Sequence, residues 1–177
     1  MRRETLWTLA GVAAVAGGFV DLIGPLLYPH MVEQAQLLTY VGIDLFLLLG
    51  MLGLQSATGQ ATGWAGLVGF VTAVGGVLLV RSSAANVLGP STYAIASAVW
   101  AIGMAIWGLA QLRPRTPFRW AGQLWFFAVL VPLAPMMFGD RRPSHQHEAH
   151  ALFALGFIVL GVQLVRVSRA SGEDRPT

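Results

Sequence analysis

The sequence of 177 residues contains no cysteine, which excludes a fold held together by disulfide bonds and a cysteine nucleophile. It also contains no lysine, so all 11 basic residues are arginines. Asp, Glu, Lys and Arg together make up only 11% of the chain, whereas a soluble domain usually carries about 25%. This shortage of charge excludes an ordinary water-soluble domain, a disordered chain and a basic nucleic-acid-binding domain.

Apolar residues are abundant, because 55% of the chain is hydrophobic and the mean hydropathy is +0.65. A helix needs about 20 mostly apolar residues to cross roughly 30 Å of hydrocarbon. By this rule the sequence predicts an all-α integral membrane protein, a bundle of six transmembrane helices with short loops, in a single domain covering residues 1–177. The predicted spans are residues 6–28, 36–54, 63–80, 93–112, 120–138 and 149–165.

We expect short loops between the spans and a first span that is kept in the mature protein. The segments between spans, such as residues 55–60, are rich in turn-forming residues and too short to be domains. We favour a retained first span over a cleaved signal peptide, because the apolar run continues past the Ala-Val-Ala sequence at residues 14–16 as far as Tyr28.

The arginines predict the orientation. Six spans place both termini on one side, together with eight of the 11 arginines, while Arg81, Arg141 and Arg142 lie on the other. By the positive-inside rule, both termini are then cytoplasmic, in the cytoplasmic membrane of a bacterium or archaeon. The lipid bilayer is the predicted partner, and arginines at span ends imply no nucleic acid.

Small residues recur at helical spacing within the spans. In lipid such rows let two helices approach closely, so they predict helix packing, not a phosphate-binding loop. The pairs are Ala10 with Ala14, Ala14 with Gly18, Ala65 with Gly69, Thr72 with Gly76, and Ala94 with Ala98.

Two acidic residues, Asp21 and Asp44, lie inside the predicted spans. A charged side chain at the centre of a membrane costs about 2.5–3.5 kcal/mol on insertion scales, so such residues usually have a function. Asp21 lies seven residues before Tyr28, and Asp44 lies eight residues after Gln36. At about 1.5 Å per residue, both lie about 10–12 Å below the outer surface. We expect the two carboxylates to face each other on antiparallel helices.

A polar stripe leads toward Asp44 from the outer surface, because Glu33, Gln36, Tyr40 and Asp44 follow spacings of three, four and four. Together with Asp21, these residues form the predicted ion- or proton-binding site. Two close carboxylates cannot both ionise at low cost, so they would share a proton or bind a cation. The alternative is that each Asp bonds to a neighbouring helix and only locks the bundle.

All four histidines, His30, His145, His147 and His150, fall on the predicted outer face. Imidazole is the commonest metal ligand, so they form the predicted metal site, and a divalent metal ion is the cofactor that the sequence suggests. On one helix His147 and His150 lie on the same side, whereas His145 points elsewhere. The alternative is an exposed polar loop whose histidines bind nothing.

Three functions remain open. The favoured one is a transporter, channel or transporter subunit with an outward-facing polar pocket linked to protons or cations. The second is a metal-dependent membrane enzyme that uses the outer histidines, although no Gly-x-Ser-x-Gly motif is present. The third is a non-catalytic assembly or scaffolding subunit.

The partner protein is also open between a second copy of the chain and another membrane subunit. In size and number of spans the chain is similar to the substrate-binding subunits of energy-coupling-factor vitamin importers, and the small residues Ala10 and Ala14 suit the docking of a partner helix.

Overall fold

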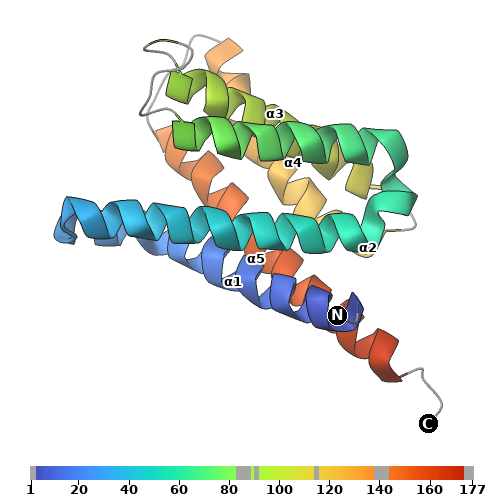
Figure 1. The fold of residues 1–177 in the computed structure, drawn as a ribbon. Coiled ribbons are helices and arrows are strands. Elements are labelled where there is room, and N and C mark those ends of the chain that lie inside the picture. Colours follow the sequence, from blue (N-terminus) through green and yellow to red (C-terminus); the bar gives the residue numbers. More distant parts are fainter. Residues whose placement is uncertain (1–2, 83–88, 90–91, 114–115, 138–143, 174–177) are drawn as a thin grey trace.

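The structure is a computed structural model that describes residues 3–82, 89, 92–113, 116–137 and 144–173. No strand occurs in these residues, so the predicted all-helical class is confirmed. The elements in chain order are α1 (Arg3–Leu27), the short 3-10 helix η1 (Tyr28–His30), α2 (Glu33–Arg81), α3 (Thr92–Gln111), α4 (Arg119–Met137) and α5 (Ser144–Glu173) (Figure 1). Arg141 and Arg142 lie outside the described residues.

Helix α2 doubles back on itself. Its 49 residues would extend about 74 Å if the helix were straight. Gly63, at φ 59° and ψ −149°, has a backbone conformation that residues with a Cβ atom rarely adopt. At this hinge the chain reverses, so the first arm (residues 33–62) and the second arm (64–81) run in opposite directions (Figure 1).

The loop predicted at residues 55–60 is wrong, because these residues are helical and α2 changes direction only at Gly63. Their Gln, Ala and Thr side chains are compatible with a helix, whereas glycine alone permits a positive φ at low cost.

An arginine satisfies the backbone at the hinge. A break in a helix leaves carbonyl groups without their usual amide donors. Nη1 of Arg113, just after α3, donates to the carbonyl oxygens of Ala61 at 3.3 Å and Thr62 at 2.8 Å. In addition, Gln111 Nε2 donates to Thr58 Oγ1 at 3.0 Å. The end of α3 therefore supports the point at which α2 turns.

Close packing of small residues is confirmed for α1. Ala10 and Ala14 are 2% and 0% exposed, and they pack against Gly53 and Gly50 of α2. On the α5 side of the same helix, a Cβ atom added to Gly161 would lie only 2.3 Å from the carbonyl oxygen of Gly11. Helix α1 thus lies between α2 and α5, in close contact with both.

The residues of the other predicted pairs differ in their surroundings. Gly69 and Gly76 lie against the backbone of Trp107 and Trp100, so the second arm of α2 packs closely on α3. By contrast, Ala65, Ala94 and Ala98 are exposed. Spacing alone cannot tell which face of an apolar helix meets protein and which meets lipid.

Aromatic side chains fill the core toward the hinge. Trp107 and Trp125 are both 0% exposed, and their stacked rings have centroids 5.9 Å apart. Phe157 of α5 lies against Trp125, with 5.0 Å between centroids. Because Trp107 packs on Gly69, six residues after the hinge, these rings close that part of the bundle.

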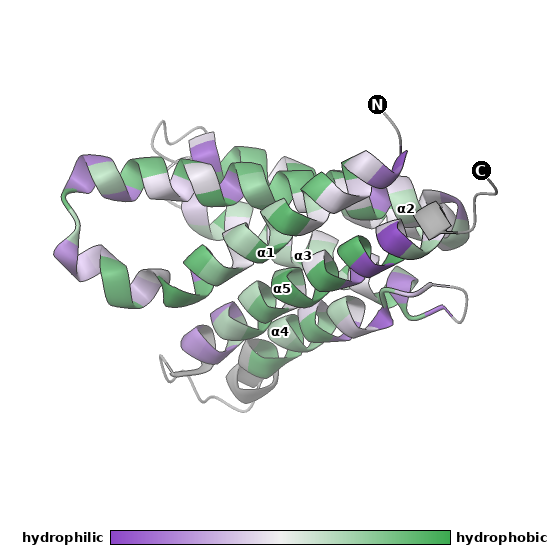
Figure 2. Cartoon of the chain, turned by 90° about the horizontal axis from the view of Figure 1, so that it is seen from below, coloured by the Kyte–Doolittle hydropathy of each residue, from purple (hydrophilic) through white to green (hydrophobic). Residues whose placement is uncertain are grey.

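Four helices in the described residues are long and apolar enough to cross a membrane: Arg3–His30, Glu33–Arg81, Thr92–Gln111 and His147–Ser171. Hydrophobic residues dominate the middle of the helices, while hydrophilic ones gather toward the ends (Figure 2). Large apolar side chains such as Leu26 and Leu38, each 74% exposed, point away from the protein interior. These features are consistent with an integral membrane protein.

Candidate functional site: a polar cavity at one end of the bundle

A cavity of about 350 Å³ lies at the end of the bundle that holds η1, opposite the hinge of α2. It draws side chains from α1, η1, both arms of α2, α3 and α5. The lining residues are Asp21, Pro25, Tyr28, Tyr40, Ile43, Asp44, Leu47, Val80, Arg81, Tyr93, Trp100, His147 and His150. The cavity thus combines both predicted membrane-embedded acids with two of the four histidines.

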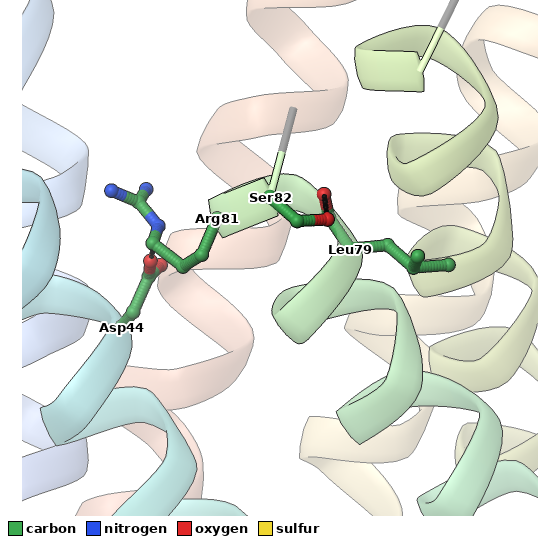
Figure 3. Close-up of polar contacts among 4 residues, drawn as sticks. All are labelled: Asp44, Leu79, Arg81 and Ser82. Atoms are coloured by element: carbon green, nitrogen blue, oxygen red, sulfur yellow. Dashed lines mark hydrogen bonds and ion pairs between the residues drawn. The ribbon is translucent and has the colours of Figure 1, made fainter. Parts of the chain in front are cut away.

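Asp44 forms an ion pair with Arg81. The Arg81 Nε atom contacts Asp44 Oδ2, and Figure 3 shows the two side chains reaching toward each other from the two arms of α2. Arg81 also lies over the ring of Tyr40, with its Cζ atom 5.9 Å from the ring centroid. From the sequence, Arg81 is used only to predict the orientation of the chain. In the structure Arg81 lines the cavity, and its positive charge offsets the negative charge of the Asp44 carboxylate.

Asp21 is joined to α5 through His150. The Nε2 atom of His150 lies 3.0 Å from the backbone oxygen of Asp21 and 3.6 Å from its carboxylate Oδ1. A carbonyl oxygen can only accept a hydrogen bond, so Nε2 carries a proton and donates it. His150, predicted as a metal ligand, is here the partner of a buried acid.

The formal charge of the cavity depends on the protonation of its two acids and of His150. With both carboxylates ionised, Asp21 and Asp44 contribute two negative charges, and Arg81 contributes one positive charge. With His150 neutral, these four groups sum to −1, and with His150 protonated they sum to zero. One proton taken up at Asp21, Asp44 or His150 would therefore remove the net negative charge.

Aromatic rings form the wall beside these charges. The rings of Tyr28 and Tyr40 have centroids 4.7 Å apart, and Trp100 lies against Phe153 with 5.1 Å between centroids. Tyr93 is 64% exposed. The faces of aromatic rings attract cations through their quadrupole, so this wall, like the carboxylates, favours a bound cation.

The remaining predicted residues lie elsewhere. Gln36 is outside the cavity and donates from Nε2 to the carbonyl oxygen of Tyr28, which ties η1 to α2. Glu33 and His30 are exposed and do not line the cavity. The side chain of His145 lies outside the described residues.

His147 lines the same cavity as His150. Among the described residues, however, no group of three His, Asp or Glu side chains is arranged to hold a metal ion. The metal site therefore stays a prediction.

Sequence reasoning missed the arginine and three of the aromatic residues of the cavity, namely Arg81, Tyr28, Tyr93 and Trp100. Arg81, Tyr28 and Tyr93 lie close to the ends of helices, where arginine and aromatic residues are expected at a membrane surface whatever their function. Trp100 lies near the middle of α3, where an aromatic side chain is expected in an apolar helix. Comparison with family models, with curated proteins and with solved structures found no match to this chain.

Proposed function

We propose that this protein is a small transport protein that exchanges a cation for a proton at the polar cavity. The observation that carries the proposal is that Asp21 and Asp44, from two different helices, line one cavity, each beside a basic partner. Acids held in an apolar bundle are costly, and in membrane proteins they mark ion and proton pathways.

The proposal includes six membrane spans. The two arms of α2 run in opposite directions and count as two spans, and the 19 residues of α4 add a further one. With α1, α3 and α5, this arrangement returns the chain to the side on which it began. The first arm has 30 residues, more than the roughly 20 that a crossing requires.

We further propose that the cavity opens to the outside and that both termini are cytoplasmic. Arg3, Arg113, Arg119, Arg166 and Arg169 all belong to the helix ends on the hinge side, and cytoplasmic surfaces carry an excess of arginine. Arg81, the described arginine at the cavity end, is paired with Asp44. It therefore counts little against this orientation.

The exchange follows from the charge balance. When His150 is neutral, the net charge of −1 attracts a cation to the carboxylates of Asp21 and Asp44. When His150 takes up a proton, the positive charge beside Asp21 competes with the cation and favours its release. Histidine suits this role because it is the side chain that changes charge near neutral pH.

The test uses the full chain in liposomes that contain a pH-sensitive dye. Sodium, potassium or methylammonium chloride is added outside, and the internal pH is recorded. We expect at least one of the three cations to drive proton movement above that of protein-free liposomes. Asp44→Asn should abolish this movement, whereas Glu33→Gln, which removes an exposed carboxylate outside the cavity at the same end, should not.

Two results would overturn the proposal. One is the absence of proton movement with all three cations, when size-exclusion chromatography and circular dichroism show a folded protein. The other is an Asp44→Asn variant as active as the original protein, which would place any transport outside this cavity.

A further inference from the structure

A second recess lies on the outer surface between α1 and α5 and runs from the middle of α1 toward the C-terminal part of α5. It is a groove of about 490 Å³. Its walls are apolar except for two arginines at one end, and the lining residues are Val12, Val15, Ala16, Phe19, Val162, Val165, Arg166 and Arg169. Val12 and Phe19 are 58% and 54% exposed, so the groove faces the surroundings of the protein and not its core.

A different recess, lined by basic and polar residues, adjoins this groove. Its volume is about 470 Å³, and Thr116, Pro117, Arg119, Trp120, Gln163, Arg166 and Val167 line it. Arg166 lines both recesses. The apolar groove and this basic recess therefore meet at Arg166.

The basic groups here lack acidic partners. Within the described part of the chain, Arg119, Arg166 and Arg169 form no ion pair, and no acidic residue lines either recess. Arg119 lies over the ring of Trp120, with its Cζ atom 5.5 Å from the centroid. Three guanidinium groups are thus free to bind an anion from outside the chain.

We propose that this surface binds an anionic phospholipid. One acyl chain lies along the groove between α1 and α5, and the phosphate contacts Arg166, with Arg169 and Arg119 on either side. The planar guanidinium group matches the geometry of a phosphate with two parallel hydrogen bonds. From Val12 to Phe19 the groove follows seven residues of helix, or about 10 Å, which is enough to hold part of an acyl chain.

The place of the arginines agrees with this assignment. Basic groups beside a membrane surface are attracted to anionic lipid headgroups, and these three belong to helix ends on the hinge side. The inference requires only that the helices lie in a membrane. It does not depend on transport at the polar cavity, so either proposal can fail without the other.

The test is native mass spectrometry of the full chain released from detergent. Phosphatidylglycerol and phosphatidylcholine with identical acyl chains are added in turn, and the bound fraction is measured against lipid concentration. We expect phosphatidylglycerol to be retained and phosphatidylcholine to be lost. The double variant Arg166→Gln with Arg169→Gln should bind phosphatidylglycerol roughly 30-fold more weakly, because each arginine contributes comparably to the attraction.

The matched control is Arg3→Gln, which removes an exposed arginine at the same end that lines neither recess. It should leave lipid binding unchanged. A third variant, Val162→Trp, narrows the groove from a side chain that is 40% exposed. It should weaken phosphatidylglycerol binding while all the arginines are kept.

Each other outcome overturns the inference. Equal retention of phosphatidylcholine would show that the surface does not select lipids by the charge of their headgroup. Equal loss of binding in Arg3→Gln would show a general effect of net charge. If added inorganic phosphate displaces the lipid completely and Val162→Trp has no effect, the surface is a phosphate site and not a lipid site.

Discussion

Asp44 and Arg81 form an ion pair although they lie 37 positions apart in a single helix. They meet because Gly63 turns α2 back between them, 19 residues after Asp44 and 18 residues before Arg81. The two residues are therefore almost equidistant from the hinge. Their contact connects the two arms of α2 at the ends far from the hinge, where both arms line the polar cavity.

This ion pair should stabilise the fold by an amount that a double-mutant cycle can measure. The Arg81 and Asp44 side chains are 37% and 20% exposed, so the pair lies between a surface pair and a fully buried one. We expect a coupling free energy of about 1–2 kcal/mol between Arg81→Gln and Asp44→Asn. Thermal unfolding of the four proteins in detergent gives this value.

Ser82→Ala is the control for that cycle. Its hydroxyl donates to the Leu79 carbonyl oxygen at 2.9 Å within the same stretch of chain, as Figure 3 shows, and does not reach Asp44. We expect no coupling between Ser82→Ala and Asp44→Asn. Additive effects of Arg81→Gln and Asp44→Asn would show that the ion pair contributes nothing to stability.

The hinge makes a separate prediction about two glycines of the same helix. Gly63→Ala places a Cβ atom on a residue at φ 59° and should lower the free energy of unfolding by about 1–3 kcal/mol. At Gly75, an added Cβ meets nothing within 4 Å, so Gly75→Ala should be neutral or stabilise by up to about 1 kcal/mol. Equal unfolding temperatures for the two variants would contradict the role given to Gly63.

The sequence predicted the helices well and the reversal of α2 poorly. Hydropathy locates apolar helices because crossing a membrane requires long runs of apolar residues, and residues 93–112 agree with α3 at Thr92–Gln111 to within one residue. Residues 55–60, in contrast, resemble a loop in composition but are helical. Few rules distinguish a glycine that packs inside a helix from one that breaks it.

That error hid the partner of Asp44. A turn centred on residues 55–60 would place Asp44 opposite a residue near position 71, about ten residues short of Arg81. A hinge at Gly63 brings Asp44 and Arg81 together, so a turn predicted at the right residue would have predicted this ion pair. The expected similar depth of Asp21 and Asp44 is based only on the rise of a helix per residue, and in the structure both residues line one cavity.

The contact of His150 with Asp21 could not be predicted in the same way. It requires α5 to pack against α1, and these helices lie at the two ends of the chain. They approach closely at glycines such as Gly18, where an added Cβ atom would lie only 2.7 Å from the Ala154 carbonyl oxygen. Which small residues meet is a property of the whole bundle, and spacing within one helix does not determine it.

His150 should give the proposed transport its pH dependence. It faces Asp21 of α1, while Asp44 and Arg81 of α2 and His147 of α5 line the same cavity. Loss of a proton from the cavity at higher pH makes its net charge more negative, so cation affinity should rise with pH. His150→Gln can still donate to the Asp21 carbonyl oxygen but cannot become charged, so this rise should be much smaller. Methylammonium-driven proton movement at a series of pH values measures it.

His30→Gln is the matched control for this series, because His30 is an exposed histidine outside the cavity at the same end. We expect its pH profile to follow that of the original protein. A His150→Gln profile that also follows it would assign the pH dependence to another group, with His147 as the next candidate in the cavity.

The close contact of α1 with α5 should affect both stability and transport. A Cβ atom at Gly161 would lie 2.3 Å from the Gly11 carbonyl oxygen, so Gly161→Ala must push the helices apart at a cost of about 1–3 kcal/mol. Gly42→Ala is the control, because nothing lies within 4 Å of its added Cβ. Separation of α1 from α5 also lengthens the contact of His150 with Asp21, so cation-driven proton movement should fall in Gly161→Ala at temperatures where the variant is still folded. If the variant is destabilised but transports normally, the His150–Asp21 contact is structural and proton exchange takes place elsewhere.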